Sequence, residues 1–519
     1  MDISRSQIAQ MIVVRASGHL LDHQREYPQW EPIEADLRYW LSDLNVGGVI
    51  LLGGNAVEVA QRTKQLRSWS SQPLLIAADI EEGVGQRFNG ATWFPPPMVL
   101  AEIAKEDEFK AICYAMQMGM ITAQEALAIG INWLLAPVVD VNNNPDNPVI
   151  NIRAFADTPE MVSKLTRAFI KGAQSLPVLA TAKHFPGHGD TSSDSHLELP
   201  IIEHELERLN KVELAPFVSA ISGKVASIMT AHLLIPALDQ IYPATISQTI
   251  IKQQLRESLG YQGLIVTDAL IMGGIANFCP ADELAVKAIE AGVDMLLMPE
   301  DPELAIDAIY KALQSGRLDP KDVGYSLERI AYAKSKLVPS EQEDLSTSLY
   351  KRDYQGLCHI ILEKSMQVSL PTPPLINRAG ENVIVVDDLL NCPYLNHNSP
   401  SIVVPRSFGY PLKLRAQSDI ALTGSMILQI FIRGNPFRGS AGLTTQNKET
   451  YLKLIQNQSL QAVIIYGSPY VAQWFKSELP RDIPFIFSYG QNDLAQAMAC
   501  EKLFAQVNPS ESYKNDFTD

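Results

Sequence analysis

The sequence is poor in cysteine and in basic residues, and it has no long apolar segment. Its five cysteines are scattered among 519 residues without a C-x-x-C pair, so we expect them to be buried apolar side chains. The net charge of −16 argues against nucleic acid or an anionic membrane as the main partner, and it favours small or neutral substrates. No apolar run reaches the ~18 residues of a membrane span. The N-terminus also lacks the apolar core and cleavage site of a secretory signal, which predicts a cytoplasmic protein.

The first part of the chain alternates short apolar runs with longer amphipathic stretches. The amphipathic stretches at 55–69, 159–175 and 282–292 have helical periodicity, so the alternation predicts βα units with parallel strands. We therefore predict a (β/α)₈ TIM-like barrel, with a doubly wound open sheet as the alternative. The strand-like runs lie at 11–17, 47–54, 73–79, 131–140, 178–184, 226–232, 263–270 and 292–299.

Polar side chains stand where these predicted strands end. Any one of them is explained by a helix cap or a turn. Catalytic groups of barrel enzymes, however, come from the carboxyl ends of several strands, which meet at one mouth. The set therefore predicts a site there, and it consists of Asp79, Asp140, Lys183 with His184, His232 and Asp268.

The stretch KHFPGHGDTSSDSH, residues 183–196, concentrates histidine directly after one of these strands. His184 and His188 have the i, i+4 spacing of a helical zinc site. Pro186 and Gly187 lie between them and are incompatible with a helix interior. We therefore predict a loop and no metal ion.

The end of the same loop offers an acid and base. Asp194 and His196 are two residues apart in an extended segment and so lie on one side of the chain. A carboxylate that orients an imidazole makes it a competent proton donor and acceptor near neutral pH. Asp268, directly after the apolar strand LIVT, offers a carboxylate nucleophile whose position is fixed by the barrel.

Four motifs together resemble the family 3 β-N-acetylhexosaminidases over residues 5–335. Glu82 departs from the family pattern, which usually has a glycine there, and Thr267 stands where a serine commonly precedes the nucleophile. The motifs are DIEEGVGQRF at 79–88, APVVDVNNNPDNPVINIRAF at 136–155, KHFPGHGDTSSDSH at 183–196 and IVTDALIM at 265–272.

The resemblance implies a retaining exo-β-N-acetylglucosaminidase that acts on cell-wall fragments such as muropeptides and needs neither a cofactor nor a metal. Asp268 is at the position of the family's nucleophile, and Asp194 and His196 are at the positions of its acid/base pair. The matching positions for sugar binding, pocket lining or support of the site are Asp79, Arg87, Arg153, Lys183, His184, His232 and Met272.

Other functions remain open at this stage. A β-glucosidase-like member of the family takes its acid from the second domain, and a non-catalytic sugar-binding protein needs no nucleophile; the intact motifs disfavour both. Phosphorolysis is a further alternative, because a histidine acid/base repels phosphate less than a carboxylate does. The sequence does not decide between water and phosphate, between N-acetylglucosamine and N-acetylgalactosamine, or between oligomeric states.

We expect three segments in the chain. Residues 1–337 form the catalytic barrel, residues 338–354 lose periodicity and form a linker, and residues 355–519 form a smaller α/β sandwich. The sandwich shows no catalytic signature of its own. Its strand-like runs lie at 382–388, 401–405, 426–434, 461–469 and 483–490.

Overall fold

The computed structural model describes residues 3–195, 197–337, 345–371, 376, 380–387, 392, 394–417, 424–434 and 442–505. The described residues form two compact units, of which the first ends at Gly356 and the second begins at Leu357. No helix among these residues is both long enough and apolar enough to cross a membrane.

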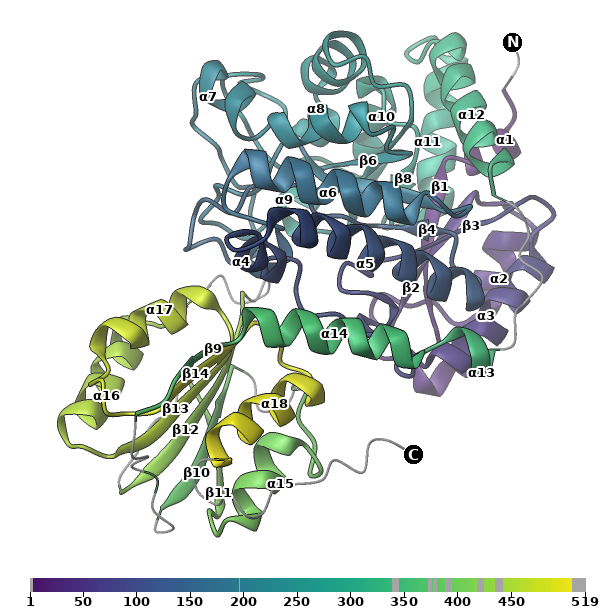
Figure 1. Ribbon diagram of the computed structural model, residues 1–519. Helices are drawn as coiled ribbons and strands as arrows, with labels where there is room; N and C mark the ends of the chain where they lie inside the picture. The colour runs from purple at the N-terminus through teal and green to yellow at the C-terminus, as the bar shows by residue number, and fades with distance from the viewer. Residues whose placement is uncertain are drawn as a thin grey trace. The chain divides into compact units, whose positions relative to one another are not determined.

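The first unit is a barrel of eight parallel strands (Figure 1). Neighbouring strands follow the order β7-β6-β5-β4-β3-β2-β1-β8, and a bridge between Val266 and Met295 joins the two end strands. This ring confirms the predicted barrel and excludes the open sheet. The strands are β1 Ile12–Ser17, β2 Gly48–Leu52, β3 Leu75–Ala78, β4 Trp133–Leu134, β5 Leu179–Phe185, β6 Ser227–Thr230, β7 Leu264–Thr267 and β8 Leu296–Leu297.

Helices surround the strands of the barrel (Figure 1). Local sequence determines where several of them begin: Asp301 and Asp319 accept backbone N–H groups in front of Pro302 and Pro320, which need no hydrogen bond in a first turn. The helices are α1 Arg5–Ala9, α2 Glu34–Ser42, α3 Ala56–Trp69, α4 Val99–Ala104, α5 Glu108–Ala128, α6 Pro159–Ala173, α7 Leu206–Lys211, α8 Ala215–Ser222, the π-type helix η5 Thr249–Ser258, α9 Gly273–Ala276, α10 Ala281–Ala291, α11 Pro302–Gln314, α12 Pro320–Ser335 and α13 Leu345–Ser348. A further helix, α14 Arg352–Ser365, begins in the first unit and continues into the second.

The second unit is a sheet with helices on both faces. Its strands follow the order β11-β10-β12-β13-β14-β9 and are parallel except for β9, which pairs antiparallel with β14. Figure 1 shows α16 and α17 on one face and α15 and α18 on the other. The elements are β9 Gln367–Ser369, β10 Glu381–Val386, α15 Pro400–Ser407, β11 Leu412–Ala416, β12 Met426–Ile432, α16 Thr445–Gln456, β13 Leu460–Gly467, α17 Pro469–Glu478, β14 Phe485–Ser488 and α18 Asp493–Phe504.

One strand prediction in this unit is wrong. The run SIVVP at 401–405 lies in helix α15, not in a strand. Pro400 provides a favourable first helical residue, and Ser401 donates from its Oγ atom to Oε1 of Gln496 in α18 at 2.7 Å. Strand preference of β-branched residues is a weak tendency, and these tertiary contacts override it.

The structure agrees only in part with the expected linker and with the expected burial of the cysteines. Residues 338–344 of the expected linker lie outside the described residues, whereas α13 and the start of α14 make 345–354 partly helical and belong to the first unit. All five cysteines are free thiols. Cys358 and Cys500 are buried as expected, and the other three are partly exposed.

Asp294 ties the last strand of the barrel to three neighbouring elements. Its carboxylate is fully buried and accepts hydrogen bonds from the backbone of Ile265 in β7, from Ser326 and Arg329 in α12, and from Arg256 in η5. A buried carboxylate needs such partners, because each uncompensated charge loses its hydration.

Replacement of Asp294 by alanine should lower the free energy of unfolding of the barrel by about 3–5 kcal/mol, because two arginines lose their buried partner. Urea unfolding measures the difference. The control is Asp322→Ala, which removes the 2.7 Å partner of Lys252 at a carboxylate that is 51% exposed. The control should cost at most about 1 kcal/mol. Equal losses in the two variants would contradict the role given to Asp294.

Candidate active site

The polar residues predicted to end strands lie on one rim of the barrel. Asp79 follows β3 directly, and Asp268 follows β7 directly. Lys183 and His184 lie near the carboxyl end of β5. Asp140 and His232 come after β4 and β6. Because all eight strands are parallel and closed into a ring, their carboxyl ends surround a common mouth.

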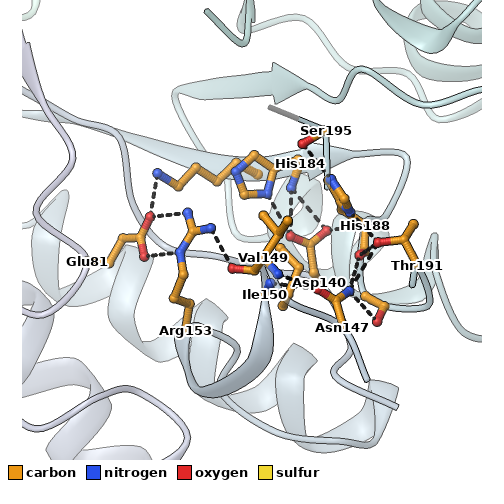
Figure 2. A network of polar contacts seen from close by, with 12 residues as sticks. Glu81, Asp140, Asn147, Val149, Ile150, Arg153, His184, His188, Thr191 and Ser195 are labelled. Atoms are coloured by element: carbon orange, nitrogen blue, oxygen red, sulfur yellow. Dashed lines mark hydrogen bonds and ion pairs between the residues drawn. The ribbon is translucent and has the colours of Figure 1, made fainter. Parts of the chain in front are cut away.

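A network of buried charges holds one side of this mouth. Lys183 Nζ lies 2.7 Å from Oδ1 of Asp79 and 2.6 Å from Oε1 of Glu81. Arg153 makes a bidentate pair with Glu81, with distances of 2.9 Å from Nε and 2.7 Å from Nη2 (Figure 2). Lys183 and Glu81 are only 1% and 3% exposed, whereas Asp79 and Arg153 are 29% and 22% exposed. Asp79 and Arg153 are therefore the members that a ligand can reach.

The pairing favours the charged forms of Glu81, Lys183 and Arg153. Burial alone would raise the pKa of Glu81, but Arg153 and Lys183 hold that pKa well below its ordinary value. Burial would likewise lower the pKa of Lys183, and the carboxylates of Asp79 and Glu81 raise it instead. The result is an arrangement of charged donors and acceptors whose hydrogen bonds are already formed.

Sequence reasoning missed Glu81. The residue stands in the quoted motif DIEEGVGQRF, two positions after Asp79, and its acidic character was the available signal. Its importance follows from contacts with Arg153 and Lys183, which are far away in sequence. The local sequence pattern does not predict such long-range contacts.

Asp140 organises the start of the histidine-rich loop. Its carboxylate is fully buried and accepts from the backbone N–H of His184 and of His188, and Nδ1 of His184 lies 2.7 Å from its Oδ2 atom (Figure 2). Since a carboxylate only accepts, Nδ1 of His184 carries the proton. The two imidazoles are edge to face with centroids 6.0 Å apart, and each is engaged by its own partners. The rejected zinc interpretation gains no support from this geometry.

His188 anchors the loop that carries the predicted acid and base. Its Nδ1 atom is 2.9 Å from Oγ1 of Thr191, and its Nε2 atom is 3.0 Å from Oγ of Ser195. Burial, with a smaller effect of His184, lowers the pKa of His188 to about 4, so the ring is neutral near pH 7. Thr191 donates its hydroxyl proton to the carbonyl of His188, so Nδ1 is the donor to Thr191 and Nε2 accepts from Ser195.

Further contacts fix the same loop. Asn147 donates through Nδ2 to the carbonyls of His188 and Gly189 at 2.8 Å and 2.9 Å (Figure 2). A Cβ atom at Gly189 would meet the carbonyl oxygen of Val141 at 1.8 Å, so only glycine fits there. Gly189 thus permits close packing of the loop against Val141.

The predicted acid/base pair is only half described. Asp194 is 3% exposed, and its carbonyl accepts from the backbone N–H of Leu197 and Glu198 at 3.0 Å each. His196 lies outside the described residues. Its role stays a prediction from the sequence.

Asp268, the predicted nucleophile, stands on a supported turn. Its backbone N–H donates to the carbonyl of Thr230 at 3.2 Å, and its Oδ1 atom accepts from the backbone N–H of Ala269 at 2.8 Å. His232 donates through Nε2 to the carbonyl of Ala269 at 3.0 Å and is 1% exposed. His232 therefore holds the nucleophile segment in place and is hidden from solvent.

The nucleophile segment also contacts the loop from β5. Gly274 in α9 donates its N–H to the carbonyl of Ser195 at 3.1 Å. A Cβ atom at Gly274 would lie 2.6 Å from that oxygen, so glycine allows the approach. Met272, predicted to line the pocket, precedes this contact and is 9% exposed.

The remaining predicted residue and the two departures from the family pattern have local explanations. Arg87 donates through Nε to the backbone carbonyl of Asp79 at 3.2 Å. Glu82 is 1% exposed and accepts from Nε1 of Trp93 at 2.8 Å. Thr267 accepts through its hydroxyl from the backbone N–H of Leu297 at 2.9 Å and so helps to join β7 to β8.

Asp190, His204 and Glu213 form a separate acidic group near the loop. Their potential ligand atoms lie within 4.8 Å of one another. The guanidinium of Arg208 is 3.2 Å from both carboxylates, and His204 is 2.7 Å from Asp190. The guanidinium of Arg208 pairs with both carboxylates, so the group is an ion-pair cluster.

Comparisons with known proteins show family matches in both units of the chain. Residues 3–333 match the glycosyl hydrolase family 3 N-terminal domain, and residues 375–505 match the bacterial glycosyl hydrolase family 3 C-terminal domain. Beta-hexosaminidase A of Pseudoalteromonas piscicida is 38% identical over 337 residues, which are 59% of this chain and 56% of that protein. A beta-hexosaminidase of Alkalilimnicola ehrlichii is 38% identical over 285 residues, which are 54% of this chain and 81% of that protein.

A solved structure extends the likeness to both units. The glycoside hydrolase family 3 beta-N-acetylglucosaminidase from Paenibacillus sp. str. FPU-7 covers 97% of this chain and 97% of its own, with a TM-score of 0.79 and 27% identity. The chain spans little more than half the length of the Pseudoalteromonas relative, 56%. The match to the N-terminal domain nevertheless takes in residues 3–333, most of the chain, and this chain therefore belongs to glycosyl hydrolase family 3.

Proposed function

We propose that the chain is a retaining exo-β-N-acetylhexosaminidase that removes a terminal β-linked N-acetylglucosamine through a glycosyl-Asp268 intermediate. The observation that carries the proposal is that Asp268 stands on the same rim as the charged network of Asp79 and Arg153. Relatives named beta-hexosaminidase, at 38% identity, suggest the N-acetylhexosamine group.

Asp268 is suited to attack the anomeric carbon. Its position directly after β7 is set by the barrel, and the contacts of Ala269 with His232 restrict the turn that carries it. In the first step a carboxylate oxygen of Asp268 forms a bond to the anomeric carbon while the bond to the leaving oxygen breaks. Water then displaces the carboxylate, and the two inversions restore the β configuration.

The Asp194–His196 pair supplies the proton in the first step and removes one from water in the second. The imidazolium of His196 protonates the leaving oxygen, and the resulting neutral imidazole later accepts a proton from the attacking water. Asp194 orients the ring and stabilises its charged form. The hydrogen bond from Ser195 to His188 supports this role, because it fixes the residue between the two members of the pair.

The non-reducing sugar binds to the charged network. Asp79 and Arg153 are partly exposed and offer an acceptor and donors for hydroxyl groups, while the buried Lys183 forms an ion pair with Asp79. We also assign His184 to the binding of this sugar, since its Nδ1 atom is held by Asp140 and its other ring nitrogen is left for a ligand. We assign to Arg87 and Met272 the lining of the same pocket, and to His232 the support of the nucleophile.

Two classes of natural substrate fit this mechanism. In peptidoglycan fragments, which the resemblance implied, the sugar on the leaving side carries a lactyl ether with a carboxylate. In chitin-type oligosaccharides that sugar is a neutral N-acetylglucosamine. The mechanism at Asp268 is the same for both substrate classes. Any preference for one class must therefore come from the residues that contact the leaving group.

A panel of 4-nitrophenyl glycosides tests the proposed function directly. The N-acetyl-β-glucosaminide should be cleaved far faster than the β-glucoside, and added phosphate should leave both the rate and the released sugar unchanged. Release of a sugar 1-phosphate would make the enzyme a phosphorylase. Equal rates on the two glycosides would favour the β-glucosidase-like alternative.

Replacement of Asp268 by alanine should abolish nearly all turnover while leaving the fold intact, because no other carboxylate takes over covalent catalysis. A 5-fluoro glycoside should label the wild-type protein on Asp268, as read by peptide mass spectrometry. Thermal unfolding of the variant provides the control for its fold. Label on a different residue would overturn the assignment.

Replacement of His196 by alanine should slow oligosaccharide cleavage by about 10²–10⁴-fold, the usual contribution of a positioned proton donor. A dinitrophenyl glycoside leaves without protonation, so its first step should survive and a burst of dinitrophenol should appear. Asp194→Asn should give a milder form of the same pattern. If both variants lose activity equally on good and poor leaving groups, the acid/base group is elsewhere.

A further inference from the structure

Arg208 in α7 connects the histidine-rich loop to the segment that follows it. Its Nη2 atom lies 3.2 Å from Oδ2 of Asp190, which belongs to the loop, and 3.2 Å from Oε1 of Glu213, which lies between α7 and α8. Asp190 is four residues before Asp194 and six before His196. The guanidinium therefore joins the segment of the proposed acid/base pair to a second carboxylate outside the loop.

The segment that carries Arg208 is itself fixed. Leu209 in α7 is 1% exposed and packs in a small apolar cluster that includes Leu233 after β6. His204, just before α7, donates from Nε2 to Oδ2 of Asp190 at 2.7 Å, since a carboxylate only accepts. Two side chains from this anchored segment thus contact the same oxygen atom of Asp190.

The two carboxylates that Arg208 joins would repel each other without it. Carboxylate oxygens of Asp190 and Glu213 lie within 4.8 Å of one another. Glu213 is 3% exposed, and a buried charge is screened much less than an exposed one. Burial raises the pKa of Glu213, and the charge of Arg208 is the strongest influence that opposes this shift. Arg208 is therefore the main compensation for the charge of Glu213.

Glu213 also packs against the backbone of the loop. A Cβ atom at Gly187 would lie 2.8 Å from Cβ of Glu213, and Gly187 has a positive φ of 130°. The stem of Glu213 has little room to move away from the loop at this point. Asp190 is the more exposed carboxylate, at 22%, so repulsion between the two would displace Asp190 and the loop with it.

Contacts lead from Asp190 to the residue between the two members of the proposed pair. Thr191, the next residue, lies 2.9 Å through Oγ1 from Nδ1 of His188. Nε2 of His188 is in turn 3.0 Å from Oγ of Ser195, which stands between Asp194 and His196 in the sequence. The position of Asp190 therefore bears on the position of the pair.

We propose that Arg208 is a positioning residue for the acid/base pair: by holding Asp190 close to Glu213, it keeps Asp194 and His196 within reach of the leaving oxygen. The proposal rests on the proposed function, in which these two residues transfer the proton. Arg208 acts through the loop and not on the substrate.

The test separates proton transfer from the rest of catalysis. The leaving oxygen of N,N′-diacetylchitobiose needs a proton, whereas that of a dinitrophenyl N-acetyl-β-glucosaminide does not. Arg208→Met should lower kcat/KM for diacetylchitobiose by about 10-fold to 100-fold, the scale of a slightly misplaced catalytic group, and leave kcat/KM for the dinitrophenyl glycoside within about twofold. A purely structural role would lower both values alike.

Arg317→Met is the matched control. The side chain of Arg317 is 37% exposed, as that of Arg208 is, and it also pairs with two carboxylates, Glu283 and Glu290 in α10. Its ion pairs do not involve the loop, so both substrates should be cleaved within about twofold of the wild-type rates.

A rescue variant tests the role of charge. Glu213→Gln keeps the shape of the side chain beside Gly187 and removes the repulsion from Asp190. Added to Arg208→Met, it should restore cleavage of diacetylchitobiose toward the wild-type rate. If the double variant is as slow as Arg208→Met alone, Arg208 does not act by compensating charge, and the inference is overturned.

Asp190→Asn guards against misfolding of Arg208→Met, which thermal unfolding would reveal. It releases the loop from the guanidinium and should show the same difference between the two substrates in a milder form. Equal loss on both substrates in a folded variant, or full activity on diacetylchitobiose in both variants, would overturn the inference. His196→Ala is measured alongside. If it shows no difference between the substrates, the proposed acid/base pair fails; if it alone shows the difference, only the role of Arg208 fails.

Discussion

The ion pair between Glu81 and Arg153, extended by Lys183 to Asp79, is the constraint on which the rest of the site depends. Two of the four side chains are almost fully removed from water, and a charge in that position is tolerated only when its partners are in place. The network joins the segments after β3 and β4 to β5. Its rigidity lets Asp79 and Arg153 face a sugar without reorganisation, which is how a preorganised polar site gains selectivity.

A second set of contacts joins the loop that follows β5 to the segment that follows β7. The loop from β5 is fixed at its base by Asp140 and Asn147 and along its length by His188. The carbonyl of Ser195 then accepts from Gly274, a few residues beyond Asp268. A hydrogen bond therefore links the segment of the proposed acid/base pair to the segment of the proposed nucleophile.

The sequence by itself determined the barrel, because strand-length apolar runs at regular intervals predict parallel βα units wherever both faces of a strand are covered. It also identified Asp79, Asp140, Lys183 and Asp268 as strand-end residues. Glu81 and the anchoring role of His188 needed the tertiary structure, since their partners are brought together by chain closure and not by local spacing. The run SIVVP forms a helix for the same reason, because Ser401 bonds to Gln496, which is distant in sequence.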